Sequence, residues 1–375
     1  MTNDAHWMHR CLELAAHGAG HVSPNPLVGA VVVGAGGAVL GEGWHARYGG
    51  PHAEVHAIEQ AEQAHGAAAL RAATLYVNLE PCSHHGKTPP CADLILAKGI
   101  PRVVVGMQDP FPEVAGRGLA RLRGAGVDVT AGVLEHACRR FNEAFIHHLR
   151  TGRPLVTLKT AQTLDGCVAT ASGHARWVSS PAARQRTHQW RAELDGILVG
   201  SGTALADDPA LTVRHVEGRQ PRRFVLDRAG VLPPTLRLFT DAHRHLTTAI
   251  VGAGAAPAYA DAVHEAGGHI LHAPVRGGHL DLGAVLGRLG QDGGRDGRPL
   301  QSLLVEAGPG LATALFREDL VDRYFCFVAP KLVGGGLPAL RALGIGTMDE
   351  ALRFAEHTWE AVEGDLLFRG YRRAA

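Results

Sequence analysis

The chain has 375 residues, of which 46% are hydrophobic and 19% charged, and its formal net charge is +1. This length predicts two or three domains, and the balanced charge argues against a nucleic-acid surface, which needs a clustered basic excess. Four of the six cysteines lack framework spacing, no signal peptide is recognisable, and the longest apolar run, residues 27–40, is broken by glycines. We therefore expect reduced thiols, a cytoplasmic protein and no membrane span.

The first half of the chain alternates between helical and strand-like patterns. We expect helices at 4–16, 51–64 and from Cys91 onward, strands at 29–33, 39–43, 75–79 and 103–105, and a helix–strand pair over 118–129. A further helix, with Phe141, Phe145 and Leu149 on one face, closes this half. The alternation predicts an α/β domain with three layers.

A polar stretch with Gly and Pro, residues 147–154, marks the domain boundary, so we predict domains over 1–149 and 150–375. Beyond it, strands are expected at 155–159, 196–199, 224–227, 248–251, 302–306, 324–328 and 365–371. The two halves show no internal repeat and do not resemble each other.

Three residues of the first half form a set of zinc ligands. His52 is followed by Glu54, and Cys82 and Cys91 come later, each next to a proline. One histidine and two cysteines leave one tetrahedral position open, which is typical of catalytic zinc. A glutamate that is not a ligand can then move protons, so the pattern predicts a hydrolytic deaminase with Glu54 as acid and base.

The alternative is a closed zinc site that only stabilises the fold. Such a site needs a fourth ligand, which His84 or His85 in the intervening loop could supply. That reading would make the protein a zinc-stabilised binding or assembly protein without catalysis.

The motifs of this half resemble the bifunctional deaminase/reductase family of riboflavin biosynthesis. The resemblance lies in His52-Ala53-Glu54, in the long insert between Cys82 and Cys91, and in the segment from Ser23 to Gly29. It implies a cytidine-deaminase-like α/β/α domain that binds one Zn²⁺ and removes an amino group from 2,5-diamino-6-ribosylamino-4(3H)-pyrimidinone 5′-phosphate. It also implies substrate contacts from Asn25, His45, His84 and Lys87.

A glycine-rich segment from Val305 to Ala314 runs from a predicted strand into a predicted helix. Glycines let the backbone approach an anion, and a helix N-terminus offers unpaired N–H groups, so this segment is a candidate phosphate site. The pattern alone is weak, because an ordinary strand-to-helix turn explains it equally well.

The resemblance extends through the second half, where 207–214, 159–161, Trp177, Glu306 and 330–335 match the reductase of the same family. It implies a dihydrofolate-reductase-like α/β domain that uses NADPH to reduce the ribosyl side chain of 5-amino-6-(5-phosphoribosylamino)uracil to ribityl. The implied NADPH contacts are Ala161, Trp177, Thr203, Asp207, Gly308, Pro309, Gly310, Leu311, Ala312, Thr313 and Ala314. The implied substrate contacts are Lys159, Ala175, Arg191, Leu211, Arg214 and Glu306.

Cys167 and Ala175 depart from the family pattern, which commonly has a basic residue and a serine at these positions. We expect an enzyme, both hydrolase and oxidoreductase, that acts on small phosphorylated pyrimidines and forms a homo-oligomer, with a dimer favoured. A rival reading is a zinc deaminase of another nucleoside or of RNA with a non-catalytic second domain. Channelling between the sites, the preference for NADPH over NADH, and the division of roles between Lys159 and Asp207 stay open.

Overall fold

The computed structural model describes residues 4–83, 89–111, 115–294 and 297–374. The chain forms two compact units, Met1–Arg150 and Thr151–Ala374. Within the described residues, no helix is long and apolar enough to cross a membrane.

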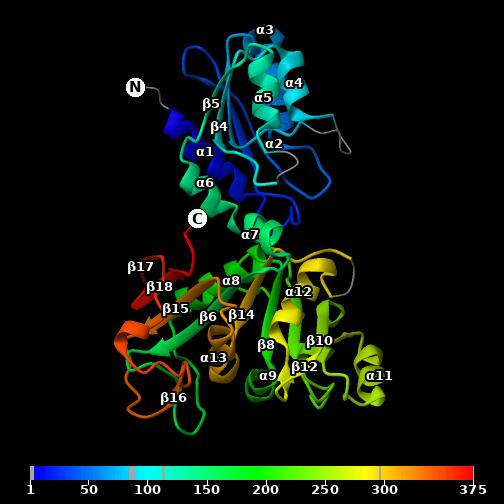
Figure 1. Ribbon diagram of the computed structural model, residues 1–375, viewed down its shortest axis with the longest axis vertical. Coiled ribbons are helices and arrows are strands. Elements are labelled where there is room, and N and C mark those ends of the chain that lie inside the picture. The colour runs from blue at the N-terminus through cyan, green and yellow to red at the C-terminus, as the bar shows by residue number, and fades with distance from the viewer. Residues whose placement is uncertain (1–3, 84–88, 112–114, 295–296, 375) are drawn as a thin grey trace. The chain divides into compact units, whose positions relative to one another are not determined.

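The first unit is built on a five-stranded sheet of order β2-β1-β3-β4-β5 (Figure 1). Strand β1 pairs antiparallel with β2 and β3, whereas β3, β4 and β5 run parallel. The strands are β1 (Gly29–Val33), β2 (Val39–Trp44), β3 (Thr74–Leu79), β4 (Arg102–Met107) and β5 (Asp128–Ala131).

Helices cover both faces of this sheet. They are α1 (Asp4–Ala16), α2 (Ala53–His65), α3 (Ala67–Leu70), α4 (Cys91–Lys98), α5 (Arg117–Gly124), α6 (Glu135–Phe141) and α7 (Glu143–Thr151). One buried cluster joins the sheet to α2, α4 and α5, and another joins it to α1, α6 and α7. The predicted three-layer α/β/α class is therefore confirmed.

Small residues bring α2 close to the edge strand β2. A Cβ at Gly41 would lie 2.2 Å from the carbonyl oxygen of Ala57, and one at Gly43 would lie 2.5 Å from that of Ala53. Because any side chain would push the helix away, these glycines fix the position of α2, whose first turn carries the predicted metal ligand and the predicted acid–base residue.

The predicted last helix of this half is wrong in one respect. Phe141 ends α6, Asn142 interrupts the helix, and Phe145 and Leu149 belong to α7, where Ile146 is the buried residue. Helix α7 also runs to Thr151, into the stretch that the sequence predicted as a linker.

The second unit contains a nine-stranded sheet of order β11-β10-β9-β8-β14-β6-β15-β18-β17 (Figure 1). The seven strands from β11 to β15 in this order run parallel, and β18 runs antiparallel to both of its neighbours, β15 and β17. Its strands are β6 (Leu155–Thr163), β8 (Gly196–Gly200), β9 (Arg222–Leu226), β10 (Thr247–Val251), β11 (His269–His272), β14 (Ser302–Glu306), β15 (Arg323–Ala329), β17 (Glu356–Val362) and β18 (Asp365–Tyr371).

Both faces of this sheet are again covered. Helices α12 (Leu282–Asp292) and α13 (Pro309–Arg317) share one buried cluster with the sheet, and α8 (Pro181–Glu193), α9 (Ser201–Asp207), α10 (Arg237–Thr240) and α11 (Pro257–Glu265) share the other. The remaining short elements are β7 (Cys167–Ala169), β12 (Val275–Arg276), β13 (His279–Leu280), β16 (Leu337–Pro338) and the 3₁₀ turns Arg244–Leu246 and Met348–Glu350.

Asp322 ties the two ends of this unit together. Its carboxylate accepts two hydrogen bonds from the Arg153 guanidinium, at 2.8 and 2.9 Å, and one from the Val156 N–H. Its carbonyl oxygen accepts the Arg372 N–H at 2.9 Å. The start of β6 and the end of β18 are thus fixed to one residue beside β15.

Candidate functional site

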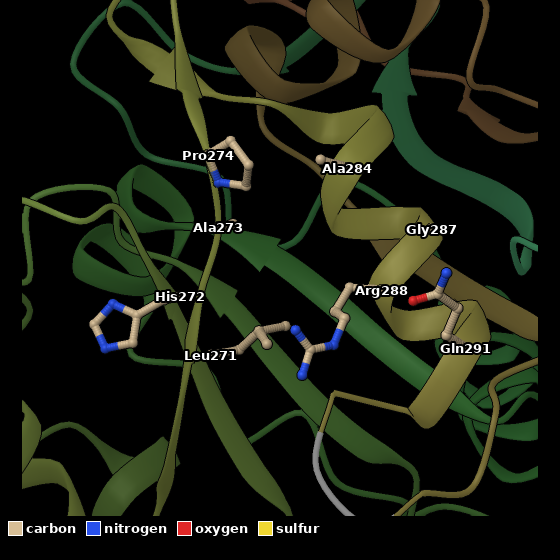
Figure 2. A pocket seen from close by; sticks show the side chains of 8 residues that line it. All are labelled: Leu271, His272, Ala273, Pro274, Ala284, Gly287, Arg288 and Gln291. Atoms are coloured by element: carbon tan, nitrogen blue, oxygen red, sulfur yellow. The ribbon is translucent and has the colours of Figure 1, made fainter.

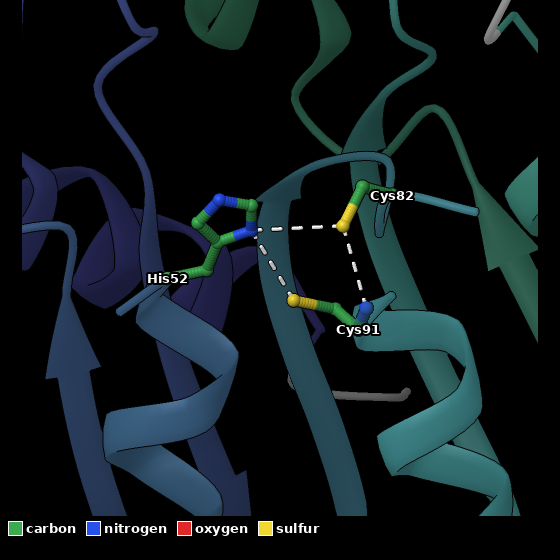
Figure 3. A group of neighbouring side chains, drawn as sticks. All are labelled: His52, Cys82 and Cys91. Atoms are coloured by element: carbon green, nitrogen blue, oxygen red, sulfur yellow. Dashed lines mark hydrogen bonds between the residues drawn. The ribbon is translucent and has the colours of Figure 1, made fainter. Parts of the chain in front are cut away.

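The three predicted metal ligands converge at the edge of the first sheet where β3 ends (Figure 3). The ligand atoms of His52, Cys82 and Cys91 all lie within 4.8 Å of one another. His52 Nδ1 is 3.6 Å from Cys82 Sγ and 3.3 Å from Cys91 Sγ. Tetrahedral zinc with ordinary bond lengths places a nitrogen and a sulfur ligand about 3.6 Å apart, so the donor set fits one zinc ion.

Two helix N-termini face this cluster. His52 is the N-cap of α2, and Cys91 is the first residue of α4. The Cys91 N–H also donates to Cys82 Sγ at 3.3 Å. Helix N-termini and N–H donors favour thiolates, and hydrogen bonds from Cys91 and then His52 lower the pKa of Cys82.

Glu54 lies in the first turn of α2 beside these ligands, and only 3% of it is exposed. Burial raises the pKa of its carboxyl group, and His52 and Cys91 oppose that effect. A raised pKa favours the protonated carboxyl group and so suits a residue that takes up and returns a proton, as general acid–base chemistry requires.

Asn25 and His45 form a hydrogen-bonded pair next to the ligands. His45 Nδ1 lies 2.9 Å from the Pro51 carbonyl oxygen and therefore carries the proton, which leaves Nε2 to accept from the Asn25 amide at 3.0 Å. Burial lowers the pKa of His45, so its ring is neutral. The ring centroids of His45 and His52 are 5.6 Å apart. His84 and Lys87 lie outside the described residues.

Glu80, directly before Pro81-Cys82, was not identified from the sequence. Its buried carboxylate accepts the N–H groups of Asp109 (3.1 Å), Gly116 (2.9 Å), Gly118 (2.8 Å) and Leu119 (3.2 Å). It therefore caps the start of α5 and fixes the chain that leads to Cys82. A glutamate at the end of an otherwise apolar strand was the available signal.

Two further asparagines hold the segment that carries Asn25. Asn142 accepts the Leu27 N–H at 2.8 Å and donates to its carbonyl oxygen at 3.0 Å, and Asn78 donates to the same oxygen and accepts the Gly29 N–H. Asn142, at the junction of α6 and α7, thus fixes this junction to the segment that carries Asn25. The signal in the sequence for Asn78 was a polar amide residue within a strand of mostly apolar residues.

In the second unit, predicted residues gather at the carboxyl ends of three neighbouring parallel strands. Lys159 lies on β6, Thr203 follows β8 on α9, and Glu306 ends β14, which is followed by Gly308 and α13. A Cβ at Gly308 would lie 3.2 Å from the Thr203 hydroxyl. Carboxyl ends of parallel strands are where α/β proteins bind ligands.

A buried charged group lies at this edge. Arg191, from α8, forms a two-pronged pair with Glu306 at 2.7 and 2.9 Å and donates to the Thr212 carbonyl oxygen. Although burial alone would raise it, the charge of Arg191 lowers the pKa of Glu306 to about 2. Burial, opposed by Glu306, lowers the pKa of Lys159. Arg191 is thus engaged with Glu306, while Lys159 is a buried amine near an anion.

The segment 211–214 lies beside this group. His188, on the same helix as Arg191, accepts the Arg214 N–H on Nδ1 at 3.1 Å. The Arg214 guanidinium is exposed and donates to the Thr212 hydroxyl. Leu211 is buried and has a φ of 51°. His188 fixes the backbone here and was missed by sequence reasoning.

Trp177 is 64% exposed, and the Arg184 guanidinium lies 4.3 Å from its ring centroid. Lys331 donates to the Trp177 carbonyl oxygen at 2.7 Å. Arg176, between the half-buried Ala175 and Trp177, donates to the carbonyl oxygen of Asp207, so this segment lies beside the end of α9. Ala161 lies on β6 and packs against the buried cluster of α8 and α9.

Within 308–314, Gly308, Pro309, Gly310, Leu311 and Ala314 keep some exposure, whereas Ala312 and Thr313 are buried. The structure also has a cavity elsewhere, between the end of β11 and α12, where Leu271 points towards Arg288 and the His272 ring points to the other side of the strand (Figure 2). None of the predicted site residues lines that cavity.

Two family models match the chain. The model of the "RibD C-terminal domain" matches residues 154–368, and that of the "Cytidine and deoxycytidylate deaminase zinc-binding region" matches residues 1–107. The second match includes His52, Glu54, Cys82 and Cys91.

Curated relatives and solved structures match over nearly the whole length. Riboflavin biosynthesis protein RibD of Escherichia coli (strain K12) is 41% identical over 360 residues, 94% of each chain, and that of Aquifex aeolicus (strain VF5) is 39% identical over 97% of each. Acinetobacter baumannii RibD, form 1, superposes with a TM-score of 0.84 at 35% identity, covering 98% of each chain. A diaminohydroxyphosphoribosylaminopyrimidine deaminase/5-amino-6-(5-phosphoribosylamino)uracil reductase of Thermotoga maritima gives 0.83 at 36% identity, also over 98% of each.

Proposed function

The chain belongs to the RibD family, the bifunctional deaminase/reductases of riboflavin biosynthesis, and we propose that each activity resides in one of its two units. The first unit, residues 1–149, removes the amino group, and the second, residues 150–375, reduces the ribosyl side chain. The observation that carries the proposal is the convergence of His52, Cys82 and Cys91 beside the buried Glu54.

In the first unit, His52, Cys82 and Cys91 would hold a zinc ion, which when bound would supply a water molecule of lowered pKa. Glu54 is placed to take a proton from the attacking water and give it to the ring nitrogen, and then to carry the proton of the added hydroxyl to the amine, which leaves as ammonia. Asn25 keeps one amide oxygen for the pyrimidine, because its NH₂ group is engaged with His45. His45 thereby orients Asn25, and His84 and Lys87 are proposed to contact the base or its ribose phosphate.

The Glu54→Gln variant tests this assignment. It preserves the size of the side chain but cannot accept the proton, so deamination should fall by at least about 100-fold while bound zinc stays at one per chain. Glu59→Gln, an exposed position on the same helix, is the matched control and should behave like the wild type. Full activity in Glu54→Gln would remove Glu54 from its role.

In the second unit, we propose that Lys159, Ala175, Arg191, Leu211, Arg214 and Glu306 contact the phosphorylated pyrimidine. The exposed guanidinium of Arg214 donates to the Thr212 hydroxyl and has further N–H groups that suit a phosphate. The pair of Arg191 and Glu306 is proposed to position the sugar between Arg214 and Lys159. NADPH supplies the hydride, and Lys159 provides a proton donor near the developing amine.

The proposed NADPH contacts are Ala161, Trp177, Thr203, Asp207 and the segment from Gly308 to Ala314. Because Ala312 and Thr313 are buried, their contacts would be made by backbone groups. Purified protein should oxidise NADPH only when 5-amino-6-(5-phosphoribosylamino)uracil is supplied, and no oxidation with that compound would refute the reductase assignment.

We further propose that the protein acts in the cytoplasm on small phosphorylated pyrimidines, without nucleic-acid or membrane partners, and that it is a homodimer. Light scattering of the purified chain tests the dimer, and a monomeric mass at micromolar concentration would refute it.

A further inference from the structure

Arg341 lies beside the N-terminus of α13, and neither the family motifs nor the predicted site includes it. A Cβ at Gly310, in the first turn of α13, would lie 4.0 Å from the Arg341 guanidinium carbon. The Arg341 side chain is exposed, and no carboxylate among the described residues forms an ion pair with it.

The first turn of α13 also offers unpaired donors. Gly308 is the N-cap without a side-chain cap, and Pro309 has no N–H group. The first backbone bond of the helix runs from the Ala312 N–H to the Gly308 carbonyl oxygen at 3.1 Å. Across the described part of the chain, the N–H groups of Gly310 and Leu311 therefore have no acceptor, and they face the same side as the positive end of the helix dipole.

Thr313 holds Arg341 in this place. Its buried hydroxyl donates to the Pro309 carbonyl oxygen at 2.7 Å and accepts the Arg341 N–H at 2.8 Å. The second of these bonds joins the 341 segment to α13, so the backbone of Arg341 cannot move away from that helix without breaking it. The Arg341 backbone is thus held beside α13, and its guanidinium lies near the two free amides.

We propose that Arg341 binds the diphosphate of the nicotinamide dinucleotide, together with the N–H groups of Gly310 and Leu311. The inference rests on the proposed use of NADPH by this unit. A guanidinium and two amides form charge-assisted hydrogen bonds with phosphate oxygens.

The position of Glu306 selects the diphosphate over the 2′-phosphate. Glu306 belongs to the proposed substrate site, where the nicotinamide must lie, and only Ala307 separates it from Gly308. Two residues of extended chain span at most about 7 Å. That reach corresponds to the middle of the cofactor, whereas the 2′-phosphate lies at its far end.

The test compares Arg341→Ala with Arg341→Lys and with the control Arg353→Ala. Arg353 is exposed, and its carbonyl oxygen accepts from Arg372, whose N–H bonds to Asp322 at the amino end of β15. Since β14, β6 and β15 run parallel, the control lies at the opposite edge of the sheet. It removes the same charge without touching α13.

Titration calorimetry with NADPH and with NADH gives the dissociation constants. We expect Arg341→Ala to weaken both cofactors about tenfold, which corresponds to about 1.4 kcal/mol, with little change in kcat at saturating NADPH. Arg341→Lys should recover part of the loss, and Arg353→Ala should bind like the wild type. An unchanged kcat at saturating NADPH and an unchanged urea midpoint of the second unit report that each variant is folded.

Unchanged dissociation constants in Arg341→Ala would refute the role of Arg341 while leaving the cofactor site in place. A loss confined to NADPH would place Arg341 on the 2′-phosphate and overturn the diphosphate assignment. A wild-type protein that binds neither cofactor would overturn the proposed reductase function itself and, with it, this inference.

Discussion

Glu80 connects the metal centre to α5, and its replacement should loosen the zinc site without touching a ligand. In Glu80→Ala, four N–H groups lose their acceptor. Water can reach the part-buried N–H groups of Asp109 and Gly116, whereas those of Gly118 and Leu119 are buried. Each buried donor without a partner costs about 1–3 kcal/mol, so we expect the first unit to lose about 4 kcal/mol of stability.

Glu80→Gln should cost roughly half as much, about 2 kcal/mol, because its single carbonyl oxygen can still accept from Gly118 and Leu119. Urea denaturation, followed by zinc release to a chromogenic chelator and by deaminase activity, measures both variants. NADPH oxidation by the second unit is the internal control and should be unchanged. Glu80→Ala with the wild-type midpoint for zinc release would refute the reasoning.

Three further outcomes are expected. Arg223→Leu leaves the Asp241 carboxylate without its partner, which is 2.6 Å away in the native fold; urea unfolding of the second unit should show a loss of about 3–5 kcal/mol, and a loss below about 1 kcal/mol would contradict this. Burial, and then the charge of Arg191, lower the pKa of His188 to about 3. Between pH 6.5 and 3 the unfolded state therefore binds a proton that the native state does not, so the free energy of unfolding decreases as the pH is lowered. His188→Gln should reduce the slope of unfolding free energy against pH by at most about 1.4 kcal/mol per pH unit. Urea midpoints of the wild type and the variant at pH 7, 6 and 5 measure this slope, and equal slopes for the two proteins would argue against the effect. Removal of zinc by a chelator should abolish deamination but preserve NADPH oxidation with the deaminated product, so joint loss of both activities would speak against independent sites.

Strands whose side chains are mostly buried were predictable from the sequence. The bounds of β1 and β14 agree with the apolar patterns at 29–33 and 302–306. The bounds of β18 agree with the expected strand at 365–371, although only three of its seven residues are buried. Strand β17 was missed because it is an edge strand with one buried residue, Val362, and therefore has no alternating pattern. Edge strand β11 was missed for the same reason.

The metal centre was predictable because its ligands are recognised by residue type and spacing. The supporting residues were not, because their contacts are to backbone groups distant in sequence. Asn142 and Leu27 are 115 positions apart, and no spacing rule predicts that pairing. Arg341 illustrates the same limit, since its position depends on a hydroxyl of α13 that only the folded chain brings near.

Asp322 has a practical consequence for separating the two activities. A reductase fragment cut at Pro154, where the family match begins, would discard the Arg153 guanidinium, which makes two hydrogen bonds with this carboxylate, and would keep the Val156 N–H and, at 3.7 Å, the Arg373 guanidinium beside it. Retaining Gly152 and Arg153 would preserve the two hydrogen bonds between the Arg153 guanidinium and the Asp322 carboxylate. Retaining Arg372 would preserve the bond from its N–H to the Asp322 carbonyl oxygen. Because residues near the start and the end of the fragment both bond to Asp322, its termini lie close together, and the fragment is also suited to circular permutation.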